Sequence, residues 1–203
     1  MSIEFLITTF IIVASPGTGV VYTLATALSR GARAGAVAAL GCTLGILPHM
    51  LAAIGGLAAI LHASAVAFEA FRYAGVAYLL YMAWNALREE GALTVKAAAA
   101  ERSSGATILH AILINILNPK LSVFFLAFLP QFASAGEAHP VFRMLLLSAV
   151  FMGMTFAVFV TYGWFAAAMR DRVVSRPSVM AWMRRTFAGA FVLLGLRLAL
   201  AER

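Results

Sequence analysis

The chain has 203 residues, of which 63% are hydrophobic and only 11% are charged, and its mean hydropathy is +0.95. A soluble domain of this length does not need so much apolar surface, so the composition excludes an ordinary globular protein and indicates a membrane protein. The net charge of +7 does not indicate nucleic-acid binding, because the basic residues fall in short segments between apolar runs.

Six apolar segments are long enough to cross a membrane, and they predict an all-α integral membrane protein with six transmembrane helices. They cover residues 3–28, 37–61, 66–88, 105–132, 141–168 and 184–201. We expect the first to be a retained helix rather than a signal peptide, because no Lys or Arg precedes it and Glu4 stands where a positive charge is usual. The whole chain, 1–203, is then a single transmembrane domain.

The first segment is interrupted by Ser15-Pro16-Gly17-Thr18-Gly19. Proline removes an amide donor and clashes with the preceding turn, so this run predicts a broken helix, with a simple proline kink as the alternative. Unpaired backbone groups inside a membrane are tolerated only where they face protein or line a cavity. The free N–H groups at the start of the second half-helix suit a carboxylate, so we expect Pro16, Gly17, Thr18 and Gly19 to bind substrate.

In the second segment, Gly41, Gly45 and His49 recur every four residues and therefore share one helix face. Small residues at this spacing are typical of close helix contact, so His49 is expected to point into the bundle. It could bind substrate or carry a proton near neutral pH; the alternative is a core histidine bonded to a backbone carbonyl. Neither the histidines nor the single Cys42 shows metal-ligand spacing, so no metal or cofactor is expected.

A polar linker at about 89–104 divides the chain into two groups of three segments, about 1–90 and 105–203. Because three is odd, two such halves that share a fold must lie inverted in the membrane. Ala74-Gly75 and Ala188-Gly189 stand at matching places in the third and sixth segments, although such identities also arise by chance. Ten of the 15 Lys and Arg residues lie on the side of the linker, which the positive-inside rule places in the cytoplasm.

The fourth segment carries Asn118-Pro119-Lys120 near its middle. A lysine at the centre of a bilayer costs roughly 2.5–3.5 kcal/mol on insertion scales, so it is rare unless it faces protein or water. Asn115 lies one turn earlier and can face the same interior. Two interrupted helices in corresponding halves are typical of a transporter's binding site, so we expect all four residues to bind substrate. The alternative is a structural role in which Lys120 pairs with helix C-terminal carbonyls.

No acidic residue lies in the middle of a predicted span, because all eight stand at span ends or in loops. A buried carboxylate is therefore missing as a proton carrier, which leaves His49 as the candidate for proton coupling. No Ser-His-Asp set, paired carboxylates or phosphate loop stands out, so we expect a transporter and not an enzyme. The alternatives are a passive channel and a membrane-embedded enzyme or electron carrier.

Taken together, these motifs resemble the lysine exporter (LysE/RhtB) superfamily, and most of all its homoserine/threonine exporter branch. The resemblance covers nearly all of the chain, and the residues that carry it are Ser15-Pro16-Gly17-Thr18-Gly19, the glycines Gly31, Gly35, Gly41 and Gly45, Ile46-Leu47-Pro48-His49, Ala67-Phe68-Glu69, Ala74-Gly75-Val76-Ala77-Tyr78-Leu79, Asn118-Pro119-Lys120 and Pro130-Gln131-Phe132.

The resemblance implies a multi-pass protein of the bacterial inner membrane that exports small amino acids or their derivatives, driven by the proton gradient. Its partners would be the substrate, protons and membrane lipid, and the sequence is also compatible with a homo-oligomer. Two positions depart from the family pattern. Thr18 stands where many members have a second proline, and Thr155 aligns with an acidic residue of some homoserine-exporter-like members. The second departure argues against coupling through a carboxylate at that position.

Overall fold

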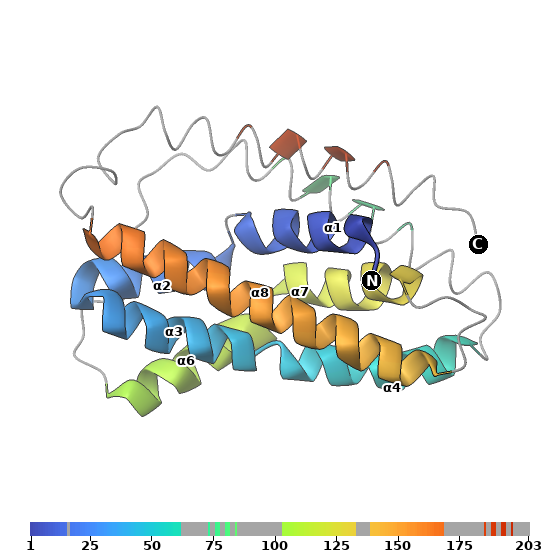
Figure 1. Ribbon diagram of the computed structural model, residues 1–203, viewed down its shortest axis with the longest axis horizontal. Coiled ribbons are helices and arrows are strands. Elements are labelled where there is room, and N and C mark those ends of the chain that lie inside the picture. The colour runs from blue at the N-terminus through green and yellow to red at the C-terminus, as the bar shows by residue number, and fades with distance from the viewer. Residues whose placement is uncertain are drawn as a thin grey trace.

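The fold is that of a computed structural model of the chain, drawn in Figure 1. The structure describes residues 1–15, 17–61, 103–132 and 139–168, together with positions 73, 76, 77, 80, 81, 84, 185, 188, 189, 192, 193 and 196. All of its regular structure in these ranges is helical. The helices are α1 (Ile3–Ala14), α2 (Thr18–Arg30), α3 (Ala32–Leu44), α4 (Leu47–Leu61), α6 (Ser104–Ile116), α7 (Pro119–Val123) and α8 (Pro140–Ala168).

Up to four membrane spans fall within the described residues. Two helical stretches are long and apolar enough to cross a membrane unaided, Ala32–Gly56 with 25 residues and Pro140–Ala168 with 29. Two more qualify only as bent pairs, α1 with α2 and α6 with residues 120–132. The predicted first, second, fourth and fifth segments are therefore helical. Only isolated positions of the third and sixth segments are described, and the inverted repeat and nearly all of the linker lie outside the described residues.

The break in the first span follows from the conformation of the residues between α1 and α2. Ser15 ends α1 in an extended conformation, and Gly17, also extended, precedes α2 without any side-chain cap. The two helices meet at a bend of 54°. The predicted broken helix is thus confirmed on either side of Pro16, which itself lies outside the described residues.

The second break occurs where α6 ends and α7 begins with Pro119. Asn118 is extended there and caps α7, because its Oδ1 accepts a hydrogen bond of 3.1 Å from the backbone N–H of Lys120. Proline is well suited to the first turn of a helix, where its missing N–H would have no partner. The bend is 57°, so this predicted break is confirmed as well.

After the second break, the chain continues as a π-helical turn, Phe124–Phe128, and a 3₁₀ turn, Leu129–Phe132. Phe124 stacks on Phe151 of α8 with ring centroids 4.4 Å apart, and Phe125 meets the same ring edge-on at 5.2 Å. Such aromatic pairs bury large apolar areas in preferred geometries. They fix the half-helix that carries Lys120 against α8.

The helix α3 lies at the centre of the packing, in contact with α2, α6 and α8. Figure 1 shows α3 and α4 following one another along the long axis, with α8 running beside them. Gly41 and Gly45 face α6 so closely that an added Cβ would lie 2.7 Å from the Cβ atoms of Ala111 and Asn115, respectively. Small residues therefore allow α3 and α6 to approach each other, as the glycine spacing predicts.

The outer face of α8 carries large apolar side chains that the described protein leaves exposed. Phe142 is 68% exposed, Trp164 60% and Phe165 52%. In a soluble protein such a surface would be unstable, whereas in a bilayer it faces hydrocarbon at no cost.

Candidate functional site

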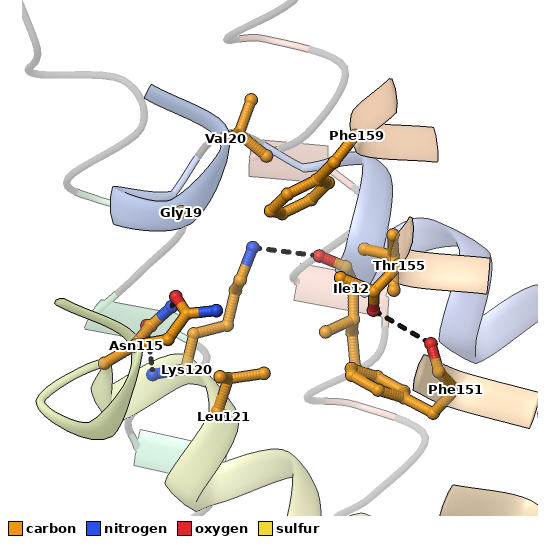
Figure 2. A pocket seen from close by; sticks show the side chains of 11 residues that line it. Ile12, Gly19, Val20, Asn115, Lys120, Leu121, Phe151, Thr155 and Phe159 are labelled. Atoms are coloured by element: carbon orange, nitrogen blue, oxygen red, sulfur yellow. Dashed lines mark hydrogen bonds between the residues drawn. The ribbon is translucent and has the colours of Figure 1, made fainter. Parts of the chain in front are cut away.

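The two breaks border a small cavity between α1, α2, α6, α7 and α8, with both apolar and polar side chains in its lining (Figure 2). Its volume is about 10 Å³, on the order of the space that one water molecule needs. Pockets that bury small ligands usually measure roughly 300–1,000 Å³, so this conformation is closed around the site. The residues that line it are Ile12, Val13, Gly19, Val20, Asn115, Asn118, Lys120, Leu121, Phe151, Thr155 and Phe159.

Lys120 reaches from the second break to the first. Its Nζ donates hydrogen bonds to the carbonyl oxygens of Ile12 at 2.9 Å and Ser15 at 3.0 Å, and to Ser15 Oγ at 3.3 Å. The side chain is only 8% exposed, and Figure 2 shows it pointing at the end of α1. The negative end of the α1 dipole and three oxygen acceptors thus offset the burial of this charge.

The carbonyls at the end of α1 would otherwise lack partners, because the last turn of any helix leaves its carbonyls free. Ile12 O also accepts from Ser15 Oγ at 2.8 Å, and Ala14 O accepts from the hydroxyl of Tyr162 on α8 at 3.0 Å. Lys120 therefore makes the contacts that a purely structural role would require, because its ammonium group bonds the carbonyls at the C-terminal end of a helix.

Asn115 and Asn118 form a hydrogen-bonded pair beside Lys120. Asn118 Nδ2 donates to Asn115 Oδ1 at 3.3 Å, and Asn115 Nδ2 donates to the carbonyl oxygen of Cys42 on α3 at 2.6 Å. Both side chains are buried. The pair holds the second break against α3 and presents amide groups to the cavity.

His49 lies behind this pair and does not line the cavity. Its Nε2 is 2.9 Å from the carbonyl oxygen of Asn115, and its Nδ1 is 3.3 Å from Ser122 Oγ. Because a carbonyl only accepts, Nε2 carries a proton, and in the neutral ring Nδ1 accepts from Ser122. His49 therefore makes the contact expected of a core histidine bonded to a backbone carbonyl. It reaches the cavity only through Asn115.

The glycines at the first break make room for these polar side chains. A Cβ added at Gly17 would lie 2.8 Å from Lys120 Nζ, and one added at Gly19 would lie 2.8 Å from Asn115 Oδ1 and 3.0 Å from Phe159. Gly17 is extended, with φ of −163°, so space and not backbone conformation is what requires a small residue there. Side chains at either place would displace Lys120 or Asn115.

The predicted site residues are thus distributed unevenly around the cavity. Those that line it are Gly19, Asn115, Asn118 and Lys120. Gly17 borders Lys120, the Thr18 side chain is exposed, Pro119 begins α7, and Pro16 lies outside the described residues.

Sequence reasoning missed Ser15 and the aromatic walls Phe151 and Phe159. Ser15 could have been found, because a proline disfavours the helical conformation in the residue before it, which leaves the carbonyl of that residue outside the helix. The aromatic residues carry no such signal, since 15 phenylalanines are spread over the chain and most face lipid or core equally well. Among the described residues, no group of three or more His, Cys, Asp or Glu could hold a metal ion.

Comparison with known proteins places these features in a family. A family model described as LysE type translocator matches residues 10–202. An uncharacterized membrane protein of Vibrio cholerae serotype O1 is 32% identical, over 98% of this chain and 97% of its own length. The homoserine/homoserine lactone efflux protein of Salmonella typhi is 30% identical over 98% and 95%, and the leucine efflux protein of Enterobacter sp. is 30% identical over 76% of each chain. No solved structure matches the chain.

Proposed function

The chain belongs to the LysE type translocator family, a family of efflux transporters and not of enzymes, and from that premise we propose that it exports small amino acids or close derivatives across the bacterial inner membrane. The names of two relatives concern homoserine, homoserine lactone and leucine, and two of these compounds, homoserine and leucine, are amino acids with uncharged side chains, which supports a substrate of that kind. Homoserine is the first compound to test.

The observation that carries this proposal is the meeting of two opposite helix ends at one cavity. The negative end of α1 and the positive end of α2 are separated only by residues 15–17, and Gly17, the N-cap residue of α2, has no side chain with which to cap its first turn. An amino acid carries one positive and one negative group a short distance apart, and this pair of helix ends is complementary to it.

In the proposed complex, the substrate carboxylate lies at the N–H groups that begin α2 and near Lys120. The ammonium group lies at the carbonyls that end α1 and at the side-chain oxygen of Asn118. The apolar walls Val20, Phe151 and Phe159 then meet the substrate side chain. Discontinuous helices provide this combination of sites in many secondary transporters.

Because the cavity is closed around a space for about one water, transport requires it to widen toward each side in turn. The 54° and 57° bends are natural places for such movement, since residues at the ends of elements absorb changes in backbone angle. The six-span, inverted-repeat architecture with a cytoplasmic linker would place the two bent spans in corresponding positions of its halves.

We propose the proton gradient as the driving force, with His49 as the proton-carrying group. Its two nitrogens already contact Asn115 O and Ser122 Oγ, and a proton added at Nδ1 would turn Ser122 from donor into acceptor. Glutamine keeps a hydrogen-bonding amide but does not titrate, so His49→Gln should leave substrate binding largely intact and uncouple export from the pH gradient. The measurement is substrate flux in proteoliposomes with and without a gradient; unchanged gradient dependence and an unchanged pH profile would remove His49 from this role.

The export function is tested directly in a bacterial host that lacks its own exporters and is sensitive to amino acids. Expression of this chain should raise tolerance to homoserine within a panel of amino acids, and purified protein in vesicles should give saturable, gradient-dependent flux. A passive channel predicts flux that neither saturates nor follows a gradient. Absence of flux for every amino acid in the panel would contradict the proposal.

A further inference from the structure

The oxygen cluster that holds Lys120 has the form of a site for a primary ammonium group. Three acceptors, the carbonyls of Ile12 and Ser15 and the hydroxyl of Ser15, converge on Nζ at 2.9–3.3 Å. An ammonium group has three N–H donors, so this cluster satisfies all of them. We call these three oxygens the α1 cradle.

No carboxylate of the described residues balances the charge on Lys120. The single acidic residue among them, Glu4, stands in the first turn of α1, at its other end. At 1.5 Å per residue, it lies roughly 16 Å along the chain axis from Ser15. The cradle therefore holds a cation through neutral oxygens and the helix dipole alone, so it selects for the ammonium group and not for lysine as such.

The start of α2 offers a second position for the ammonium group of Lys120. Its side chain borders Gly17, where even one added carbon would lie 2.8 Å from Nζ, and the cavity that it lines continues to Gly19 and Val20 in the first turn of α2. A carboxylate bound at that start would lie next to the ammonium of Lys120. Charge-assisted hydrogen bonds to a carboxylate are stronger than those to neutral carbonyls, so a bound carboxylate draws Lys120 away from the cradle.

We propose that the α1 cradle is the subsite for the substrate's ammonium group, and that Lys120 fills it whenever the transporter is empty. A zwitterion exchanges with Lys120 without leaving any charge unpaired: its ammonium takes the cradle while its carboxylate receives Lys120. An amine without a carboxylate would instead bring a second cation to the cradle, and a carboxylate without an amine would leave the cradle oxygens bare. The inference rests on the proposed amino-acid substrate and predicts that a zwitterion binds better than an amine or a carboxylate alone.

The exchange predicts that removing the lysine creates a binding site for a simple amine. Purified Lys120→Met protein is titrated with methylammonium chloride while its melting temperature is followed. A saturable rise of roughly 2–5 °C is expected at about ten times the dissociation constant, since a ligand that binds the native state stabilises it. The wild-type protein, whose cradle is filled, should show no such rise.

Tetramethylammonium chloride is the matched control, because it has the same charge and ionic strength but no N–H donor. It should not stabilise Lys120→Met, and adding Ser15→Ala to that variant should weaken methylammonium binding by removing one acceptor. Where Lys120→Met folds poorly, methylammonium but not tetramethylammonium should restore its folded yield. Equal effects of the two salts, an equal shift in the wild type, or no recovery of folded protein would each overturn the proposal.

This test needs no transported substrate, so its outcome is separate from that of the export assay. A second arm uses wild-type protein and three related compounds: homoserine, 3-amino-1-propanol, which lacks the carboxylate, and 4-hydroxybutyrate, which lacks the ammonium. Only homoserine should bind tightly, with each analogue weaker by about tenfold or more. Tight binding of 3-amino-1-propanol by the wild type would show that Lys120 does not compete for the cradle.

Discussion

Replacing Lys120 by methionine is expected to weaken substrate binding by roughly 10- to 150-fold while the protein still folds. The variant loses a charge-assisted contact to the substrate carboxylate, and such contacts contribute about 1.5–3 kcal/mol. Its melting temperature should change little, because two effects oppose each other. The oxygens of Ile12 and Ser15 lose a donor, while the cost of burying a charge disappears.

The matched variant is Lys120→Arg, which keeps the charge but replaces a compact ammonium by a wider planar group. It should retain partial binding at best. If Lys120 serves only to cap α1, the order of effects is reversed: Lys120→Met lowers folded yield and melting temperature, and whatever folds still binds normally. Thermal stability and binding measured on the same preparation separate the two accounts, and normal binding by a stable Lys120→Met protein would contradict ours.

Gly41→Ala is expected to destabilise the whole bundle. An added Cβ would lie 2.7 Å from the carbonyl oxygen of Ile108 and 2.9 Å from its Cα, and these backbone atoms cannot move aside as a flexible side chain can. The helices α3 and α6 must then separate. Overpacking of this kind costs about 1–3 kcal/mol, and each kcal/mol lowers the melting temperature of a protein of this size by roughly 2–4 °C.

Gly55→Ala on α4 is the control for helix propensity, because no atom of the described residues lies within 4 Å of a Cβ added there. Alanine forms helix better than glycine, so this variant should melt at or above the wild-type temperature. A fall of equal size in both variants would show that loss of glycine, and not contact with α6, is responsible. Gly41→Ala should also weaken transport, because it shifts α3, and the carbonyl oxygen of Cys42 on α3 accepts the hydrogen bond that holds Asn115 in place.

The sequence predicted the two breaks because each is marked by proline inside an apolar run, and proline acts through local covalent chemistry. It also predicted a close helix contact on the face that carries Gly41 and Gly45, because these glycines recur at the helix period, and the structure shows α6 as the partner. These signals need no knowledge of the rest of the chain. We expected the two breaks to form one site because Lys120 and the asparagines lie in mid-membrane, where polar side chains need polar partners.

The sequence could not indicate which atoms Lys120 contacts. A buried lysine pairs equally well with a carboxylate, with water or with carbonyls, and the choice depends on how α1 and α7 lie in space. His49 illustrates the same limit: its face was predictable from the glycine spacing, but its position behind Asn115 depends on the turn between α3 and α4. The aromatic walls are invisible to sequence reasoning, because apolar side chains toward a cavity and toward lipid look alike.

The central claim is that substrate binds in the cavity between the two breaks, and protection of a single introduced thiol tests it most directly. Val20→Cys, in a Cys42→Ala background, places the thiol on the cavity wall, and Leu113→Cys places one on the exposed side of α6, where the side chain is 50% exposed. Both are modified with a small thiol reagent, with and without saturating homoserine. We expect homoserine to slow modification at position 20 severalfold and to leave position 113 unchanged. Equal rates at position 20 with and without a homoserine concentration that saturates transport would contradict the account.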